Sequence, residues 1–157
     1  MTRIPITPRG KKMLEERLKH LKSVERPKNI RDIEEARAHG DLSENAEYSA
    51  AKERQGQLEF QIREVEHLIA SAHVIDPATI KEEKVVFGAT VTLRDIESDD
   101  DVTYCIVGKT EASIQESRIS IESPIARALL GKMEGDEVKV QTPNGMKEFE
   151  IVEVKYL

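Results

Sequence analysis

The apolar residues in the first half of the chain recur at intervals of three and four, which is the period of one helix face. In the clearer of two such runs the positions are Tyr48, Ala51, Gln55, Leu58, Ile62, Val65, Ile69 and Ala72, of which only Gln55 is polar. A stripe of this kind on a charged segment predicts a coiled-coil seam. The helix is expected to end before Asp76-Pro77, because a residue that precedes proline disfavours helical geometry.

An earlier run, from Thr7 to Gly40, carries the same spacing less regularly. Thr7 suits the N-cap of a helix and Pro8 its first position, whereas Gly40 suits its end. Pro27 interrupts the run, so we expect a kink or a fresh helix start there. The apolar positions are Leu14, Leu18, Leu21, Ile30, Ile33 and Ala36.

Two helical runs of nearly equal length with a short polar connection predict an antiparallel coiled-coil hairpin. About thirty residues per arm, at 1.5 Å per residue, give a rod of roughly 45 Å. Residues 38–48 would form its tip, and two carboxylates, Asp41 and Glu44, lie within this segment.

From Lys84 onward, β-branched and aromatic residues predict strands over residues 85–93, 102–107, 137–142 and 148–155. Ser123-Pro124 is expected to open a short helix that ends before Gly131. A small antiparallel sheet with one helix packed on it would be the result. The predicted class is therefore α+β, with a hairpin at 1–75, a linker at 76–83 and a globular domain at 84–157.

Acidic residues fill the expected turn between the first two strands, at 95–101. The composition suggests a calcium loop, but the run lacks the ligand spacing and the central glycine that such a loop needs. We interpret it as a solvated turn.

The net charge of −6 is unevenly distributed. Residues 1–75 hold 14 Lys/Arg against 13 Asp/Glu, whereas residues 76–157 hold 10 against 17. The acidic half argues against duplex nucleic acid as its partner, because phosphate neutralisation needs clustered Lys and Arg. It suits a basic protein surface, although an acidic face kept for solubility explains the charge equally well.

Other features predict a soluble cytoplasmic protein without a membrane partner. The single cysteine, Cys105, has neither a disulfide partner nor a ligand-spaced neighbour, which favours a reducing compartment. No apolar run approaches the roughly 20 residues of a membrane span. The N-terminus lacks the apolar core of a signal peptide.

The acidic tip has two interpretations. Asp41-Leu42-Ser43-Glu44 matches a capping box, in which Asp41 would cap the second helix and Glu44 would reach back. Alternatively, the two carboxylates would bind Mg²⁺, which proteins often hold through one or two carboxylates plus water and phosphate oxygens. A bare tip would bind the ion weakly, so a partner would supply the other ligands, and the ion could then orient a water for attack on a phosphodiester.

Basic and aromatic side chains flank the two acids. Arg37 precedes the first acid by four residues, and Lys52 and Arg54 lie on the opposite arm. These cations could contact an RNA phosphate or base, although isolated charges are more often only solvated. Tyr48 occupies a seam position, where packing is its expected role ahead of base stacking. His39 is weak evidence for a metal ligand or a proton relay.

Four segments give the chain a resemblance to the Gre family of bacterial transcript-cleavage factors over essentially its whole length. They are IPITPRG at 4–10, RAHGDLSENAEY at 37–48, VFGATV at 86–91 and SPIARALLGK at 123–132. In this light, capping by the tip acids is compatible with a functional role. One departure is Ala38, where many relatives carry an acidic residue.

The resemblance implies an FKBP-like fold for the second domain and a role on backtracked RNA polymerase. The globular domain would dock at the rim of the secondary channel while the hairpin enters. Asp41 and Glu44 would stabilise Mg²⁺ and a water in the polymerase's own active site, so that the extruded RNA 3′ end is cut. The protein would then be no enzyme by itself.

The resemblance also assigns contacts. Arg37 and Lys52 would contact RNA, and Ser123 and Pro124 would contact polymerase. The implied partners are bacterial RNA polymerase, the nascent RNA 3′ end and, weakly and through the complex, DNA. We expect a monomer.

Three rival functions remain open. A polymerase inhibitor could use the same architecture to block the channel without cleavage, although the Asp41/Glu44 pair favours cleavage. A prolyl isomerase is less favoured, because the second half has few aromatic residues and no Trp to line a pocket. A structural coiled-coil adaptor would explain the hairpin but not the tip.

Overall fold

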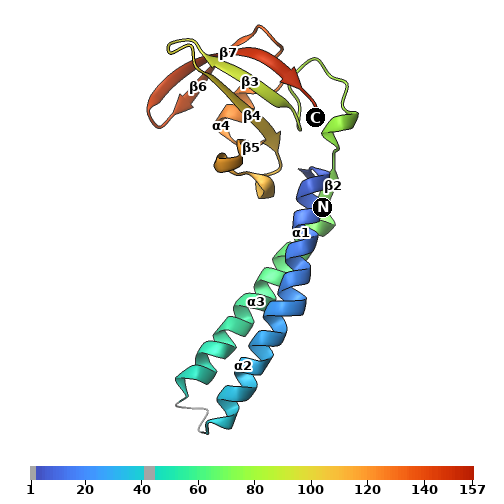
Figure 1. The fold of residues 1–157 in the computed structure, drawn as a ribbon, viewed down its shortest axis with the longest axis vertical. Coiled ribbons are helices and arrows are strands. Elements are labelled where there is room, and N and C mark those ends of the chain that lie inside the picture. The colour runs from blue at the N-terminus through green and yellow to red at the C-terminus, as the bar shows by residue number, and fades with distance from the viewer. Residues whose placement is uncertain (1–2, 41–44) are drawn as a thin grey trace. The chain divides into compact units, whose positions relative to one another are not determined.

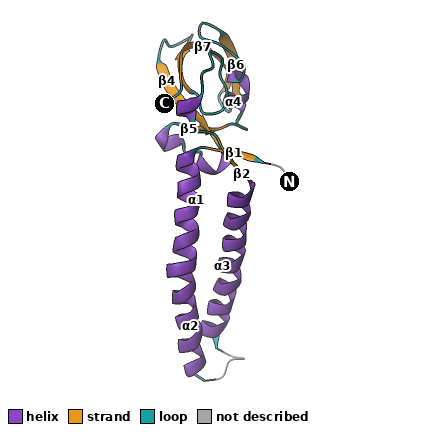
Figure 2. Ribbon diagram, turned by 90° about the vertical axis from the view of Figure 1, so that its right-hand side faces the viewer, coloured by secondary structure: helices purple, strands orange, loops and turns teal. Residues whose placement is uncertain are grey.

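The computed structural model describes residues 3–40 and 45–157. It divides the described chain into two compact units, one of residues Lys11–Ala72 and one of Arg3–Gly10 together with His73–Leu157. The first is a helical hairpin and the second is built on a sheet, so the α+β class is confirmed (Figure 2). Arg3–Gly10, expected within the hairpin, groups with the second unit. None of the helices within the described residues is long and apolar enough to cross a bilayer.

Three α-helices form the two arms of the hairpin (Figure 1). They are α1 (Pro8–His20), α2 (Arg26–Ala38) and α3 (Ala46–Ser71). The predicted stripe of α3 is confirmed, since half of its positions are buried and the others are half-buried. The buried members are Ala51, Leu58, Ile62 and Val65.

A single π-helical turn, Leu21–Glu25, joins α1 to α2. The N–H of Arg26 donates to the carbonyl of Leu21, five residues back. Pro27 follows directly, has no N–H to donate, and in a regular helix its ring would collide with the carbonyl four residues earlier. The irregularity predicted at Pro27 therefore takes the form of a widened turn just before it.

The π turn adds one residue to the spacing of the buried positions on the first arm, and so changes which residues face α3. Leu14 and Leu21 are seven residues apart and both buried, but the next buried position is Asn29, eight residues on. Ile33 and Ala36 follow it at intervals of four and three. Because of the extra residue, the prediction that Ile30 lies in the seam is wrong. Its side chain is 45% exposed, whereas Asn29 is 4% exposed and its Nδ2 donates to the carbonyl of Ala51 at 2.9 Å.

Ion pairs link the two arms along their exposed flanks. Arg26 binds both carboxylate oxygens of Glu59, at 3.0 and 2.9 Å. Arg54 lies 3.5 Å from Glu25, so the cation is directed along the hairpin toward the π turn. Exposed pairs of this kind contribute little each, and burial of the seam remains the main source of stability.

The second unit contains a five-stranded sheet in the order β5-β4-β3-β7-β6. The strands are β3 (Thr90–Asp95), β4 (Asp101–Val107), β5 (Arg118–Ser120), β6 (Glu137–Thr142) and β7 (Gly145–Lys155). All neighbours are antiparallel except β4 and β5, which are parallel. A second, two-stranded sheet pairs β1 (Ile4–Ile6) with β2 (Ala72–Val74). The three-residue strands β1, β2 and β5 were not predicted.

Helix α4 (Pro124–Leu129) packs on the five-stranded sheet through Ala126 and Leu129, which are fully buried. Its predicted extent is confirmed to within one residue. The core beneath it draws on the three inner strands β4, β3 and β7, with Val91, Leu93, Ile106 and Ile151 all at 0% exposure.

The first predicted strand begins five residues later than expected. Residues 85–89 form a turn before Thr90, since Gly88 has a left-handed φ of +91° that strand geometry does not allow. Val85 is nevertheless fully buried and bonds through its backbone to Gly131 and Lys132. The Tyr156 hydroxyl fastens the same segment, because it accepts from the N–H of Val86 and donates to the carbonyl of Lys84. Burial raises the pKa of Tyr156.

Candidate functional site

The two acids of the predicted tip, Asp41 and Glu44, lie outside the described residues. The structure does describe the residues on either side of them. Helix α2 ends at Ala38, and Gly40 follows with a left-handed φ of +113°, as predicted for a helix stop. The second arm resumes at Asn45, directly before α3.

Asn45, rather than Asp41, is the N-cap of α3. Its Oδ1 accepts from the N–H of Tyr48 at 3.1 Å, three residues on, which is the geometry of a side-chain cap. The structure thus assigns the cap of α3 to Asn45, four residues after Asp41, and the capping box predicted at Asp41 and Glu44 lies outside the described residues. The sequence carried a signal for Asn45, a favoured cap residue placed three positions before the first seam residue.

The amide nitrogen of Asn45 makes a second contact. Its Nδ2 donates to the carbonyl of Ala36 at 2.7 Å, in the last turn of α2. This carbonyl also accepts from the N–H of His39 at 3.2 Å. One side chain thus satisfies an otherwise unpaired N–H of α3 and adds a second bond to a carbonyl in the last turn of α2, which ties the two arms together.

Two further side-chain contacts cross between the arms beside this link. The guanidinium of Arg37 lies over the ring of Tyr48, 6.0 Å from its centroid, at the outer limit of a cation–π contact. His39 Nδ1 lies 3.0 Å from a carboxylate oxygen of Glu47. Tyr48 is half-buried, in keeping with the predicted packing role, whereas Arg37, His39 and Glu47 are exposed.

The second predicted RNA-contact residue, Lys52, lies one helical turn beyond Tyr48 on α3. It is exposed, and its ammonium donates to the Gln55 side chain at 2.8 Å. Residues four apart share a helix face, so Lys52 follows the Arg37–Tyr48 contact along α3. Arg54, by contrast, is drawn to Glu25 and away from the tip.

Ser123 and Pro124 lie together at the start of α4. The Ser123 hydroxyl accepts from the N–H of Ala126 at 3.2 Å and so caps this helix. Pro124 occupies the first turn and is exposed. The structure therefore gives Ser123 a local role and leaves the ring of Pro124 accessible. The assignment of both residues to docking stays a prediction.

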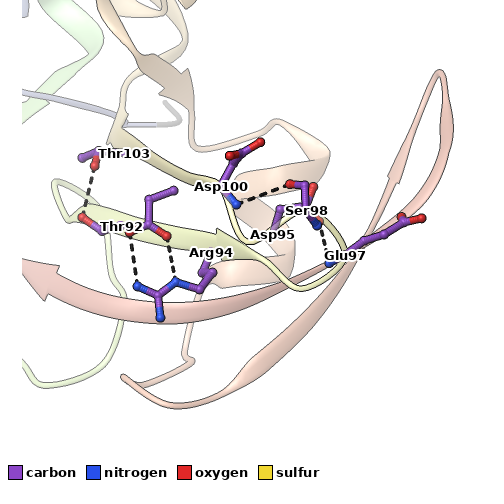
Figure 3. A network of polar contacts seen from close by, with 8 residues as sticks. Thr92, Arg94, Asp95, Glu97, Ser98, Asp100 and Thr103 are labelled. Carbon is purple, nitrogen blue, oxygen red and sulfur yellow. Dashed lines mark hydrogen bonds and ion pairs between the residues drawn. The ribbon is translucent and has the colours of Figure 1, made fainter.

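The acidic turn between β3 and β4 uses its carboxylates for local bonds (Figure 3). Asp95 Oδ1 accepts from the N–H groups of Glu97 and Ser98, at 2.9 and 3.3 Å. The Arg94 guanidinium donates to Asp101 at 2.9 Å, a bond that raises the pKa of Arg94. Across residues 3–40 and 45–157, no three His, Cys, Asp or Glu side chains are grouped as metal ligands would be.

A buried carboxylate in the second unit was not predicted. Glu111 is 4% exposed and accepts from the N–H groups of Thr7 and Gly108, at 3.0 and 3.2 Å, and from the Thr7 hydroxyl. The Thr7 oxygen in turn accepts from Gly10 N–H at 3.1 Å, which confirms Thr7 as the cap of α1. Glu111 therefore anchors the N-terminal segment. Its short 3₁₀ turn gives no periodic signal in the sequence.

Two family models match the chain. One, described as "Transcription elongation factor, N-terminal", covers residues 4–74, and the other, described as "Transcription elongation factor, GreA/GreB, C-term", covers residues 80–156.

Individual relatives match over nearly their full length. Transcription elongation factor GreA of Neisseria meningitidis serogroup A is 56% identical, and all of both chains is covered. The factor of the same name from Anaeromyxobacter sp. strain K is 57% identical over 100% of this chain and 95% of its own. A solved structure, GreA factor homolog 1 (Gfh1) of Thermus thermophilus, is 25% identical, covers 97% of this chain and 98% of its own, and has a TM-score of 0.43. On the sequence matches, the chain belongs to the GreA/GreB family of transcription elongation factors.

Proposed function

We propose that this elongation factor rescues backtracked or arrested bacterial RNA polymerase by inserting the hairpin tip through the secondary channel. Asp41 and Glu44 then enter the polymerase active site and complete the ligand set of a Mg²⁺ ion held mainly by the polymerase. The ion supplies charge stabilisation at the scissile phosphodiester and an activated water. Cleavage releases the extruded RNA 3′ segment, and synthesis resumes from the new end. The factor lends carboxylates and is not itself a nuclease.

The observation that carries the proposal is the link between the two helix ends that flank Asp41 and Glu44 in the sequence. Asn45 bonds to Ala36 at 2.7 Å, so the intervening segment leaves and re-enters the hairpin at adjacent points. Two carboxylates are a sufficient protein contribution to Mg²⁺, provided that phosphates, waters or other carboxylates complete the shell. A two-helix apex has little protein around it to supply them, so a partner must.

The basic residues beside the tip support RNA as the substrate. Arg37 and Lys52 are exposed, and Lys52 lies one turn beyond the Tyr48 ring on which Arg37 rests. These two cations lie on opposite arms, beside the tip. They would neutralise phosphates of a single RNA strand while the two acids act at the scissile phosphodiester.

The second unit would supply docking to polymerase. Pro124 is exposed at the start of α4, and the Ser123 cap holds it in place. The acidic charge of residues 76–157 suits a basic protein surface. In this arrangement one copy acts per polymerase, and any DNA contact is weak and made through the complex.

A channel-blocking inhibitor is the alternative with the same architecture. The two functions differ in what the tip acids do once the hairpin is inserted. A blocker needs only bulk at the tip, whereas a cleavage factor needs the carboxylates themselves. This chain carries both carboxylates, Asp41 and Glu44.

The test is RNA cleavage on backtracked polymerase complexes with the Asp41→Ala and Glu44→Ala variants. We expect each variant to compete with the wild-type factor for polymerase and to lower the cleavage rate by about 10²-fold or more, as removal of a charge-stabilising group does. Glu47→Ala is the matched control, because it removes a neighbouring acid that pairs with His39, and it should retain most activity. Full cleavage by the Asp41→Ala/Glu44→Ala double variant would rule out the mechanism.

A further inference from the structure

The strongest unassigned feature is the double hydrogen bond of Asn45. Its Oδ1 accepts from Tyr48 N–H at 3.1 Å and its Nδ2 donates to the Ala36 carbonyl at 2.7 Å. We call this arrangement, made of Asn45, Tyr48 and Ala36, the Asn45 clasp. An ionised carboxylate could accept the first bond but cannot donate the second, and the short hydroxyl of Ser or Thr would not reach Ala36. The amide accepts through its oxygen and donates through its nitrogen.

The clasp acts on the two helix ends that flank the tip segment. Ala36 belongs to the last turn of α2, and its carbonyl accepts from the Asn45 amide as well as from the N–H of His39. Tyr48 N–H is among the donors that the start of α3 leaves unpaired within the helix. Because one planar amide serves both groups, the separation and the rotation of the two helix ends are set together.

The neighbouring contacts are poorer candidates for this task. The side chains of His39 and Glu47 are 62% and 71% exposed, and a contact between side chains so exposed restrains geometry weakly. Arg37 lies 6.0 Å from the Tyr48 centroid on a long, flexible stem. Asn45 is half-buried, and its side chain is short.

We propose that Asn45 is a positioning residue, which fixes the separation and the rotation of the α2 and α3 ends that flank Asp41 and Glu44 in the sequence. This inference rests on the proposed function of those acids. A misplacement of about 1 Å in a reacting group costs up to 10²-fold in rate, so a residue that touches neither RNA nor metal controls the rate of cleavage.

The first variant is Asn45→Ser. Serine keeps a good N-cap for α3 but is too short to reach Ala36, so the helix start is preserved while the link is lost. The matched control is Asn29→Ser, which removes the other Asn side chain that donates to a carbonyl of the facing arm, that of Ala51 at 2.9 Å. Asn29 lies in the middle of the hairpin, about two turns before Ala36.

The readouts separate position from binding and stability. With backtracked complexes, we expect Asn45→Ser to lower the maximal cleavage rate by about tenfold while the half-saturating concentration stays within about twofold. Asn29→Ser should lower the melting temperature at least as much, yet keep the maximal rate. Equal loss of rate in both variants, or a wild-type rate in Asn45→Ser, overturns the inference.

A second experiment, a spectroscopic distance measurement, does not depend on cleavage. Spin labels are placed on the exposed positions of Glu35→Cys and Ser49→Cys, in a Cys105→Ser background. We expect a broader distance distribution between the labels in Asn45→Ser than in the parent or in Asn29→Ser. An unchanged distribution overturns the clasp. If instead the distribution broadens but the Asp41→Ala/Glu44→Ala double variant still cleaves fully, the proposed function fails and the geometric role of the clasp stands.

Discussion

Two glycines within helices differ in what surrounds them. Gly10 lies in the first turn of α1, where a Cβ would overlap the side-chain carbons of the buried Glu111. That carboxylate is held by Thr7 and Gly108, so it cannot move aside without loss of its hydrogen bonds. Gly56 lies in the middle of α3, and nothing lies within 4 Å of its added Cβ. The first glycine is required by close packing, whereas the second only makes the helix backbone more flexible.

These surroundings predict opposite effects of one substitution. Gly10→Ala should lower the free energy of unfolding by about 1–3 kcal/mol, because it overpacks a buried site. Gly56→Ala should raise it by about 0.5–1 kcal/mol, since alanine is the better helix former. Urea unfolding followed by circular dichroism measures both. Equal effects of the two substitutions would contradict the packing role of Gly10.

Among the elements, the π turn of the first arm decides which residues face α3. Without its extra residue, the seven-residue spacing from Leu14 and Leu21 would bring Lys28 and Glu35 into the seam. With it, Asn29 and Ala36 take those positions, and Ile33 is buried at 7% exposure. A one-residue change of phase therefore keeps two charged side chains in water.

The phase shift predicts that neighbouring isoleucines respond differently. Ile33→Ala should destabilise the hairpin by about 2–4 kcal/mol, as expected for truncation of a buried aliphatic side chain. Ile30→Ala should change stability by no more than about 0.5 kcal/mol, because its side chain is already largely in water. Thermal unfolding of the two variants provides the comparison. A large loss at Ile30 would mean that the first arm keeps a regular helical phase.

At the scale of the whole molecule, the chain has two separate apolar cores. The hairpin is held by its seam, whereas the second unit is held by the cluster between the sheet and α4. Leu58 belongs to the first core and Leu129 to the second, and both are essentially inaccessible to solvent. Each unit therefore carries its own source of stability.

This division predicts separable losses of protection. Leu58→Ala should lower the opening free energy of amides in the hairpin by about 3 kcal/mol and spare the strands β3 and β7. Leu129→Ala should do the reverse. Native-state hydrogen exchange, resolved by residue, measures both patterns. A uniform loss across both units in either variant would indicate a single cooperative fold.

The parts of the fold that the sequence predicted well are those with a sustained period. The α3 stripe and the strands around Val91, Ile106 and Val138 each repeat over several residues, so burial could be read from spacing. Strands of three residues have no period to detect. Pro27 signalled an irregularity in the first arm, but not that the helix would take up one extra residue before it. Without that knowledge, the burial of Asn29 and the exposure of Ile30 could not be predicted.

The sequence predicted which residue types lie at the candidate site, but it did not predict the contacts that these residues make. Arg37 and Lys52 are exposed on the two arms, and their contact with RNA stays a prediction. Asn45 was missed because the acids before it formed a more conspicuous capping pattern. The cap is decided by where the chain turns between the arms, a long-range property that local pattern does not contain.

The buried seam, whose phase the π turn sets, also restricts how the length of the hairpin can change. Insertion of one residue within a regular α-helical stretch of either arm, where no π turn absorbs it, turns everything beyond it by about 100°. The faces that meet water and the partner helix are then exchanged. Lengthening without this exchange requires complete seven-residue repeats in both arms, or about 10 Å at a time. The length of the hairpin can therefore change only in increments of about 10 Å if the buried seam is to be kept.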